Sequence, residues 1–197
     1  MKLTQLAAFL ALSSAAAISQ AAPIWQDFSI TGLYGENYAH PVNMDDNNQQ
    51  TTATVEYTAK LKYGDFFGFA DRAHNDFENS TYFELSPRLS LSAVTGTKLE
   101  AGPIKDILIA GTWEANSSNY PDADFNNYLY GIGFDLAIPY FQYAQLNFYK
   151  ADNEKGTTDD YQMTADTVSQ LNLVQKIFLL TASLTGQQVK MQLMQVS

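Results

Sequence analysis

The chain has 197 residues, a formal net charge of −10 and no cysteine. Without cysteine it can form neither a disulfide framework nor a thiolate metal site, and so acidic a surface excludes nucleic acid as an expected partner. Aromatic residues make up 13% of the sequence, with 12 tyrosines and 12 phenylalanines, yet the mean hydropathy is only −0.21. A membrane β-barrel hides its polar half in the lumen, so its mean hydropathy stays low although it is rich in aromatic residues.

Residues 1–21 have the three regions of a secretory signal peptide. Lys2 supplies a positive start, residues 6–17 are an unbroken run of Ala, Leu, Phe and Ser, and Ser19-Gln20-Ala21 fits the small-x-small cleavage pattern. This run is shorter than the roughly 20 residues of a membrane-spanning helix. We therefore predict export with loss of residues 1–21, where cleavage after Ala22 is equally compatible and a short buried helix is the alternative.

Three later segments alternate between apolar and polar side chains with a period of two. The longest is residues 52–63, and the others are residues 82–91 and 127–136. Weaker alternation predicts further strands; these are residues 28–34, 66–72, 104–113, 140–149 and 161–165. Segments of about ten residues with apolar and polar faces are typical of strands that cross an outer membrane.

The segments between the strands also alternate. Residues 36–50, 73–80, 115–126 and 151–159 are rich in Asn, Asp, Ser and Thr, which predicts long loops. Tighter joints are expected at Gly64-Asp65, near Thr95-Gly96 and at Ile138-Pro139. Long loops at one end and short turns at the other are typical of membrane barrels, with the long loops outside the cell. Aromatic girdles near the strand ends are expected from Trp25, Tyr63, Trp113, Tyr128 and Tyr149.

These patterns predict an all-β protein, a transmembrane antiparallel β-barrel. We divide the chain into a signal peptide (residues 1–21), a barrel portion of about eight strands (residues 22–165) and an aberrant tail (residues 166–197). A soluble periplasmic β-sandwich is the alternative fold, because its strands would alternate too.

Three stretches resemble the nucleoside-specific channel family of Gram-negative outer membranes, the Tsx and OmpK type. They are Trp25-Gln-Asp-Phe-Ser29 leading to Leu33-Tyr-Gly35, then residues 60–72 (KLKYGDFFGFADR), then residues 83–91 (FELSPRLSL). The resemblance runs from about Trp25 to Ala165. It implies a twelve-stranded porin through which nucleosides diffuse, and it implies a receptor that bacteriophages and colicins use.

The resemblance also implies substrate contacts. Tyr38 lies where the family has an aromatic residue in the first external loop, and Phe69 and Asp71 lie where it has an aromatic-x-Asp pair near the mouth. By strand parity, the lumen should also receive Glu56, Lys60 and Lys62 from one strand and Tyr82, Glu84 and Arg88 from another. Aromatic rings would stack on the base, and ionisable groups would bind the sugar. A charge lattice that only stabilises the barrel is the alternative role for each ionisable residue.

The tail from Asp166 onward differs from the rest. Val168, Leu171, Val174 and Phe178 recur at spacings of three and four, a weak helical signal. No Tyr or Trp follows Tyr161, and the chain falls about four strands short of the twelve that the resemblance implies. We therefore expect a C-terminal truncation caused by a frameshift near residues 165–167, and unpaired edge strands that would destabilise the barrel in a bilayer. A divergent tail with a short helix is the alternative.

The function expected is passive passage of nucleosides, with outer-membrane lipid and lipopolysaccharide as surroundings and no cofactor or metal. A structural or adhesin-type barrel without transport is the main alternative. An outer-membrane enzyme would depend on His40, His74 and Ser80 in external loops, but no G-x-S-x-G motif accompanies them.

Overall fold

The computed structural model describes residues 22–36, 49–155, 160–171, 176–185 and 188–196. Their strands form one antiparallel sheet in which each strand pairs with its neighbour in sequence. The strands are β1 (Trp25–Gly35), β2 (Gln50–Leu61), β3 (Gly64–Asn75), β4 (Asn79–Ser90), β5 (Ile104–Ser118), β6 (Phe125–Leu136), β7 (Phe141–Asn153), β8 (Asp160–Leu171), β9 (Lys176–Thr185) and β10 (Gln188–Val196). The predicted all-β antiparallel class is confirmed.

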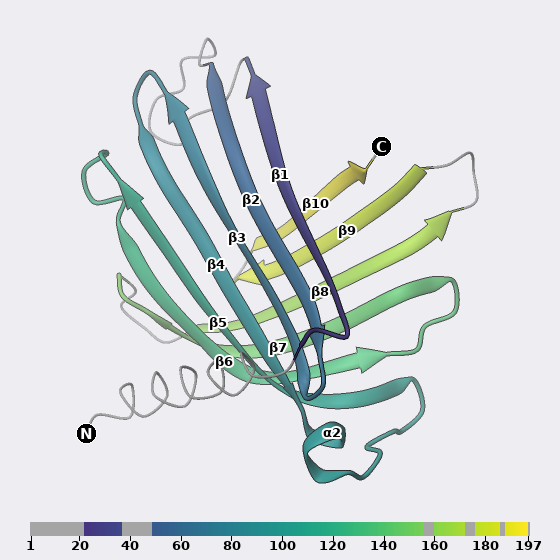
Figure 1. Cartoon of the computed structure of the whole chain (residues 1–197). Coiled ribbons are helices and arrows are strands. Elements are labelled where there is room, and N and C mark those ends of the chain that lie inside the picture. The colour runs from purple at the N-terminus through teal and green to yellow at the C-terminus, as the bar shows by residue number, and fades with distance from the viewer. Residues whose placement is uncertain (1–21, 37–48, 156–159, 172–175, 186–187, 197) are drawn as a thin grey trace.

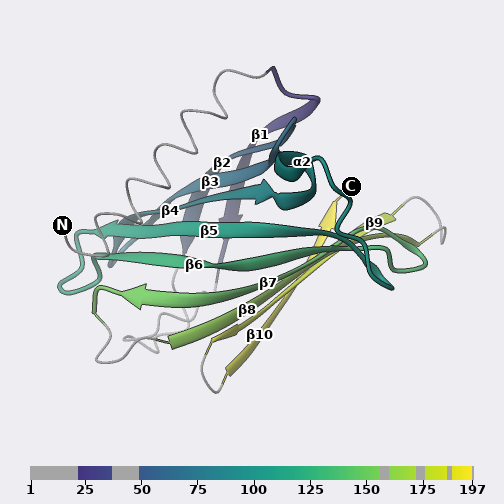
Figure 2. The same ribbon diagram turned by 90° about the horizontal axis from the view of Figure 1, so that it is seen from below.

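The sheet is strongly curled, and it is open in the described part of the chain, with β1 and β10 at its two edges (Figures 1 and 2). Strands β1 to β8 are 11 to 15 residues long. A strand tilted by about 45° needs roughly 9–11 residues to span the hydrocarbon core of a membrane. Among the described residues, no helix is long and apolar enough to cross a membrane.

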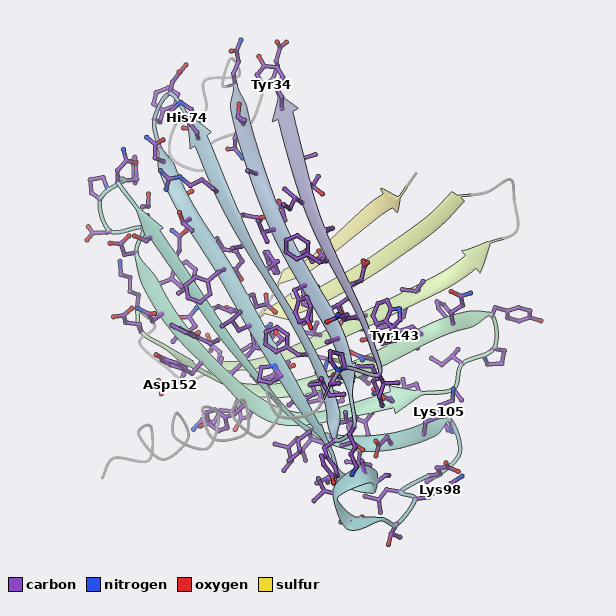
Figure 3. The ribbon with its side chains drawn as sticks, viewed as in Figure 1. Tyr34, His74, Lys98, Lys105, Tyr143 and Asp152 are labelled. Atoms are coloured by element: carbon purple, nitrogen blue, oxygen red, sulfur yellow. The ribbon has the colours of Figure 1, made fainter. Side chains whose placement is uncertain are left out.

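The ends of the sheet differ. At one end, here called the turn end, residues 62–63 join β2 to β3, and residues 137–140 join β6 to β7. The other end, here called the loop end, carries the connections from β1 to β2, β3 to β4, β5 to β6 and β7 to β8. In Figure 3, Tyr34 and His74 mark the loop end, whereas Lys98 and Lys105 mark the turn end.

Two connections differ from the sequence prediction. Residues 73–80 are not a long loop, because β3 and β4 leave only residues 76–78 between them. Asn75 makes this turn tight, since its side-chain Oδ1 accepts from the backbone N–H of Phe77 at 2.9 Å and of Glu78 at 2.7 Å. The polar composition therefore marks an Asx turn and not a long loop.

The connection near Thr95-Gly96 is longer than predicted. It contains a short helix, α2 (Leu91–Thr95), which lies at the turn end (Figure 1). The hydroxyl of Ser90 caps the helix by accepting from the N–H of Ala93 at 3.0 Å, and Gly96 ends it with a φ of 68°. A residue with positive φ at the end of a helix favours glycine, so Gly96 marks a helix C-cap where a hairpin turn was expected.

The tail also differs from its predicted helical character. Residues up to Leu171 continue β8, and residues 176–185 and 188–196 form β9 and β10. Val168 pairs with Tyr143 in β7, so the alternation of β8 runs past Asp166. The backbone groups at the free side of a strand need partners in a membrane, and another strand supplies them where an isolated helix does not.

The signal-peptide prediction for residues 1–21 lies outside the described residues.

Candidate functional site: the concave face of the sheet

The two faces of the sheet are distinguished by contacts between strands that are not neighbours. The Nζ atom of Lys60 in β2 lies 3.8 Å from a carboxylate oxygen of Asp135 in β6. The guanidinium of Arg88 in β4 reaches Asn147 in β7 at 3.4 Å. Such contacts require the sheet to curl around the face that carries these side chains, which we call the inner face (Figure 2).

The opposite, outer face is apolar. Ile30, Ile109 and Ile132 point outward by strand parity, and their side chains are 71%, 54% and 52% exposed. An exposed apolar surface of this extent is unusual for a soluble protein and is the surface that a membrane barrel presents to lipid. Among the residues predicted for aromatic girdles, Trp113 and Tyr128 lie on this face and stack with ring centroids 6.3 Å apart.

Tyr149 was predicted in a girdle, and this prediction is wrong. Its side chain points to the inner face and is only 5% exposed. The register places Tyr149 opposite Gly131 of β6, where the absence of a side chain leaves room for the ring. The weak alternation of residues 140–149 did not show which face Tyr149 takes. Its pairing with Gly131 places the side chain on the inner face.

Four aromatic rings form a continuous row on the inner face. The ring centroids of Phe67 and Phe69 are 5.8 Å apart, those of Phe69 and Tyr82 are 5.6 Å apart, and those of Tyr82 and Phe125 are 6.2 Å apart. Strands β3, β4 and β6 therefore supply one row of rings, here called the aromatic row. Neighbouring rings are tilted against each other by 43° to 55°, and aromatic pairs prefer such arrangements over a face-to-face sandwich.

Carboxylates flank the aromatic row on both sides. Glu56 in β2 and Glu84 in β4 are both directly opposite Phe69 in the register. Asp71, two residues beyond Phe69 on the same face, accepts a hydrogen bond from the hydroxyl of Thr54 at 2.6 Å. Glu84 accepts from Ser86 at 2.8 Å and from the Tyr82 hydroxyl at 3.4 Å. Rings and hydrogen-bond acceptors thus alternate on one surface.

An ion-pair network lies nearer the turn end, between Lys60, Asp65, Arg88 and Asp135. Arg88 binds Asp65 through two parallel hydrogen bonds, from Nε at 2.7 Å and from Nη2 at 2.8 Å. Nη2 also donates to Asp135 at 2.9 Å, and Lys60 lies 3.0 Å from Asp65. Two parallel bonds to one carboxylate give an arginine pair its geometric specificity.

The inner face of β5 to β7 is filled by packed side chains. Leu108 is fully buried, and Ala110, Leu129, Tyr149 and Ala151 are each at most 5% exposed. Arg88 and Asn147 are buried with them, at 4% and 3% exposure. A molecule that follows the inner face therefore meets the aromatic row and its carboxylates, and not the guanidinium of Arg88.

Of the residues predicted for the site, seven lie on the inner face: Glu56, Lys60, Phe69, Asp71, Tyr82, Glu84 and Arg88. The structure brings Glu56, Phe69, Asp71 and Glu84 together at the aromatic row, while Lys60 and Arg88 belong to the ion-pair network. Lys62 lies in the turn after β2, with its Nζ 4.9 Å from the ring centroid of Tyr63. Tyr38 lies outside the described residues.

The neighbours Asp71 and Arg72 take opposite faces. Asp71 points inward, and Arg72 points outward, where Nη1 donates to the hydroxyl of Thr81 at 3.0 Å. Sequence reasoning missed Phe67 and Phe125 in the aromatic row, and Asp65 and Asp135 in the network. Phe67 has the same parity as Phe69, so strict alternation from Phe69 would have found it.

Of the residues of the enzyme alternative, His40 lies outside the described residues, and His74 and Ser80 point to opposite faces of the sheet. His74 points outward and bonds the side chain of Asn79, whereas Ser80 has the parity of Tyr82 and points inward. Among the described residues, no group of three or more His, Cys, Asp or Glu side chains is arranged to hold a metal ion.

The fold and the candidate site together define an outer-membrane channel-type protein. It has long antiparallel strands, an apolar outer face and an inner face of rings and charges. The family model for the nucleoside-specific channel-forming protein, Tsx, matches residues 25–183, and the chain belongs to this family. The matched range continues past Asp166, into the segment where β8 continues.

Individual relatives agree with the family assignment. Outer membrane protein OmpK of Vibrio parahaemolyticus is 22% identical over 151 residues, which cover 72% of this chain and 54% of that protein. The nucleoside-specific channel-forming protein Tsx of Escherichia coli O157:H7 is 26% identical over 171 residues, which cover 76% of this chain and 56% of that protein. The chain thus spans about half the length of the curated relatives it matches. It is an outer-membrane protein of a channel family.

Proposed function

We propose that this chain forms part of a passive outer-membrane path for nucleosides, with the aromatic row as its substrate-contacting surface. The observation that carries the proposal is the row of Phe67, Phe69, Tyr82 and Phe125, with successive ring centroids 5.6 to 6.2 Å apart. A nucleobase is an aromatic ring, and it gains stacking energy at each of these rings in turn. Repeated weak sites allow a solute to enter and to leave, as conduction requires.

The carboxylates beside the row supply the second part of recognition. Ribose presents hydroxyl donors, and Glu56, Asp71 and Glu84 present acceptors around Phe69. Asp71 and Glu84 already accept hydrogen bonds from Thr54 and Ser86, which orients each carboxylate toward the inner face. As the base moves from ring to ring, the hydroxyl groups of the sugar would transfer their hydrogen bonds from one carboxylate to the next.

Lys60 and Arg88 act differently in this proposal. Each is held by Asp65 and Asp135, and Arg88 is buried. Their role is to hold β2, β3, β4 and β6 in the curvature that places the aromatic row along the path. This is the structural role that the sequence left open for each ionisable residue.

Flux measurements on the full chain in lipid vesicles test the proposal. Uridine flux should saturate as uridine concentration rises, whereas flux of free ribose should stay linear, because only the nucleoside has a base to stack. Linear flux of both solutes at equal rates would rule out a binding path. An absence of flux for both solutes would favour the structural or adhesin-type barrel instead.

The proposal assigns the chain no enzymatic chemistry. A receptor role for bacteriophages or colicins at the loop end stays a prediction from the family resemblance, and phage adsorption to cells with and without the protein tests it.

A further inference from the structure

A groove runs along the outer face over β3, between side chains of β2 and β4. Its floor is formed by Ala70, which lacks a long side chain, and by Gly68, which is covered. The ring of Phe66 and a methyl group of Leu85 lie 3.0 Å from where a Cβ atom of Gly68 would stand. The register places Tyr57 and Leu85 on either side of Gly68, and Val55 and Phe83 on either side of Ala70. Together with Phe66 and Phe69, these residues line one apolar hollow. The floor is only one strand wide, which suits a single extended chain of methylene groups.

Two aromatic pairs stiffen the walls of this groove. Tyr57 and Phe66 lie with ring centroids 6.1 Å apart on one side, and Phe83 meets Trp113 edge-to-face at 4.8 Å on the other. The hydroxyl of Tyr57 donates to Gln26 at 2.8 Å, which fixes the first wall further. These contacts restrict the aromatic side chains that border the groove, and the ring of Phe66 closes it over Gly68.

A positive charge stands at the loop end of the groove. Arg72 continues the line of Gly68 and Ala70 on β3, and its side chain is exposed. Its Nη1 donates to Thr81 at 3.0 Å, and in the part of the chain described by the structure it forms no ion pair. His74 follows on the same face, at the end of the sheet marked in Figure 3.

The position of Arg72 along β3 corresponds to the depth of lipid headgroups in a membrane and not to the depth of acyl chains. It lies three residues before the end of β3 at Asn75, which corresponds to about 10 Å at roughly 3.3 Å per residue. An outward arginine is costly at the middle of a membrane and nearly free of cost at its interface. The apolar groove therefore lies at acyl-chain depth, with the cation above it at the level of the headgroups.

We propose that this groove is a specific binding site for lipid A, the phosphorylated glycolipid of the outer leaflet, with one acyl chain over Ala70 that ends against the ring of Phe66 and a phosphate on Arg72. The loop end faces the outer leaflet if the longer loops lie outside, and this is the leaflet that carries lipid A. Arginine is suited to phosphate because its planar donors match two phosphate oxygens at once. The rings of the aromatic row point to the other face of the sheet, and Phe69 is the one residue of the row that also borders the hollow.

Native mass spectrometry of the full chain, purified in detergent and titrated with lipid A, tests the site. Arg72→Gln should weaken lipid A binding about tenfold or more, the loss typical of a hydrogen bond to a charged group. Ala70→Leu, which fills the groove with an apolar side chain, should weaken binding by a similar factor. Arg72→Lys should bind more weakly than the original chain and more tightly than Arg72→Gln, because the charge remains while the match to two phosphate oxygens is lost.

Matched controls use the same substitutions elsewhere. Lys98→Gln removes one exposed positive charge at the turn end, and Ala165→Leu enlarges an outward side chain on β8. Both should bind lipid A as the original chain does. Uridine flux should be unchanged in all five variants, so a failure of this site is distinguishable from a failure of the nucleoside path.

Three results would overturn the proposal. Equal lipid A affinity in every variant would mean non-specific contact with surrounding lipid only. Equal affinity for phosphatidylglycerol would remove the assignment to lipid A. A dimer in lipid-free detergent that Ala70→Leu converts to a monomer would make the groove an interface between two copies.

Discussion

At the scale of single residues, Arg88 has the greatest structural consequence. One guanidinium makes four hydrogen bonds, which join β4 to Asp65 in β3, Asp135 in β6 and Asn147 in β7. Its side chain is 4% exposed, so these partners replace nearly all of its water. A buried ion pair adds little net stability, but removing one partner is costly because the other charges stay behind.

Arg88→Met should therefore destabilise the folded chain by about 3–5 kcal/mol, since the carboxylates of Asp65 and Asp135 lose their cation. Urea unfolding in lipid vesicles, followed by tryptophan fluorescence, measures this change. The control is Lys98→Met, because Lys98 is 85% exposed and its pair with Glu100 at 3.5 Å is a surface contact. A loss for Arg88→Met no larger than the loss for Lys98→Met would remove Arg88 from its structural role.

The sequence predicted the face of these residues better than their contacts. Parity placed Glu56, Lys60, Glu84 and Arg88 on one face, and the register confirms that placement. Parity did not distinguish the residues that line the proposed nucleoside path from the residues whose ion pairs hold the strands together. Lys60 meets Asp135 only because β2 and β6 approach each other across the curled sheet, and no local pattern encodes that distance.

At the scale of elements, two glycines of neighbouring strands face different surroundings. A Cβ atom added to Gly131 in β6 would collide with the backbone carbonyl of Phe148 in β7, whereas one added to Gly111 in β5 would meet only the carbonyl of Leu129, at 3.7 Å. Backbone atoms of a paired strand cannot move aside as a flexible side chain can. The close approach of β6 and β7 therefore requires glycine at position 131.

Gly131→Ala should destabilise the chain by at least about 2 kcal/mol, as overpacking against fixed atoms does. Gly111→Ala should change the stability by less than about 0.5 kcal/mol, as surface substitutions usually do. The fraction of each variant that folds into vesicles, scored by protease protection, checks the difference. Equal folding of the two variants would contradict the tight register of β6 and β7.

The turn between β3 and β4 offers a second test at this scale. Asn75→Ala removes the acceptor of two backbone N–H groups, those of Phe77 and Glu78, and should cost about 1–2 kcal/mol. Asp76→Ala changes an exposed residue of the same turn and should have little effect. Urea unfolding of both variants measures the difference, and an equal response would show that Asn75 does not hold the turn.

Connections and the tail were the elements that sequence patterns predicted least well. Polar composition is shared by tight Asx turns and long loops, so residues 73–80 could not be distinguished from a loop by composition alone. The apolar spacing of Val168 and Leu171 suggested a helix, but pairing with β7 made this segment part of β8. Cross-strand pairing outweighs a weak local period when a neighbouring strand is available.

At the scale of the whole molecule, the curvature of the sheet brings side chains from separate strands together into one candidate site. The curled sheet places rings from β3, β4 and β6 in one row and leaves the apolar side chains outside (Figure 2). The family resemblance predicted the class of protein, and the family match confirms it. The frameshift near residues 165–167 stays a prediction, and resequencing of the coding DNA across that region tests it.

The central claim is that bases stack on the aromatic row, and Phe69 lies between two of its other members. Flux through vesicles that contain the full chain tests it most directly, with Phe69→Ala compared with Phe28→Ala. Phe28 points outward and is 59% exposed, so its loss leaves the path intact. Loss of one stacking ring is worth roughly 1–3 kcal/mol per base. The account predicts that Phe69→Ala lowers uridine flux at low concentration about tenfold while ribose flux and Phe28→Ala stay near the original values. Equal loss of uridine and ribose flux in Phe69→Ala would contradict it.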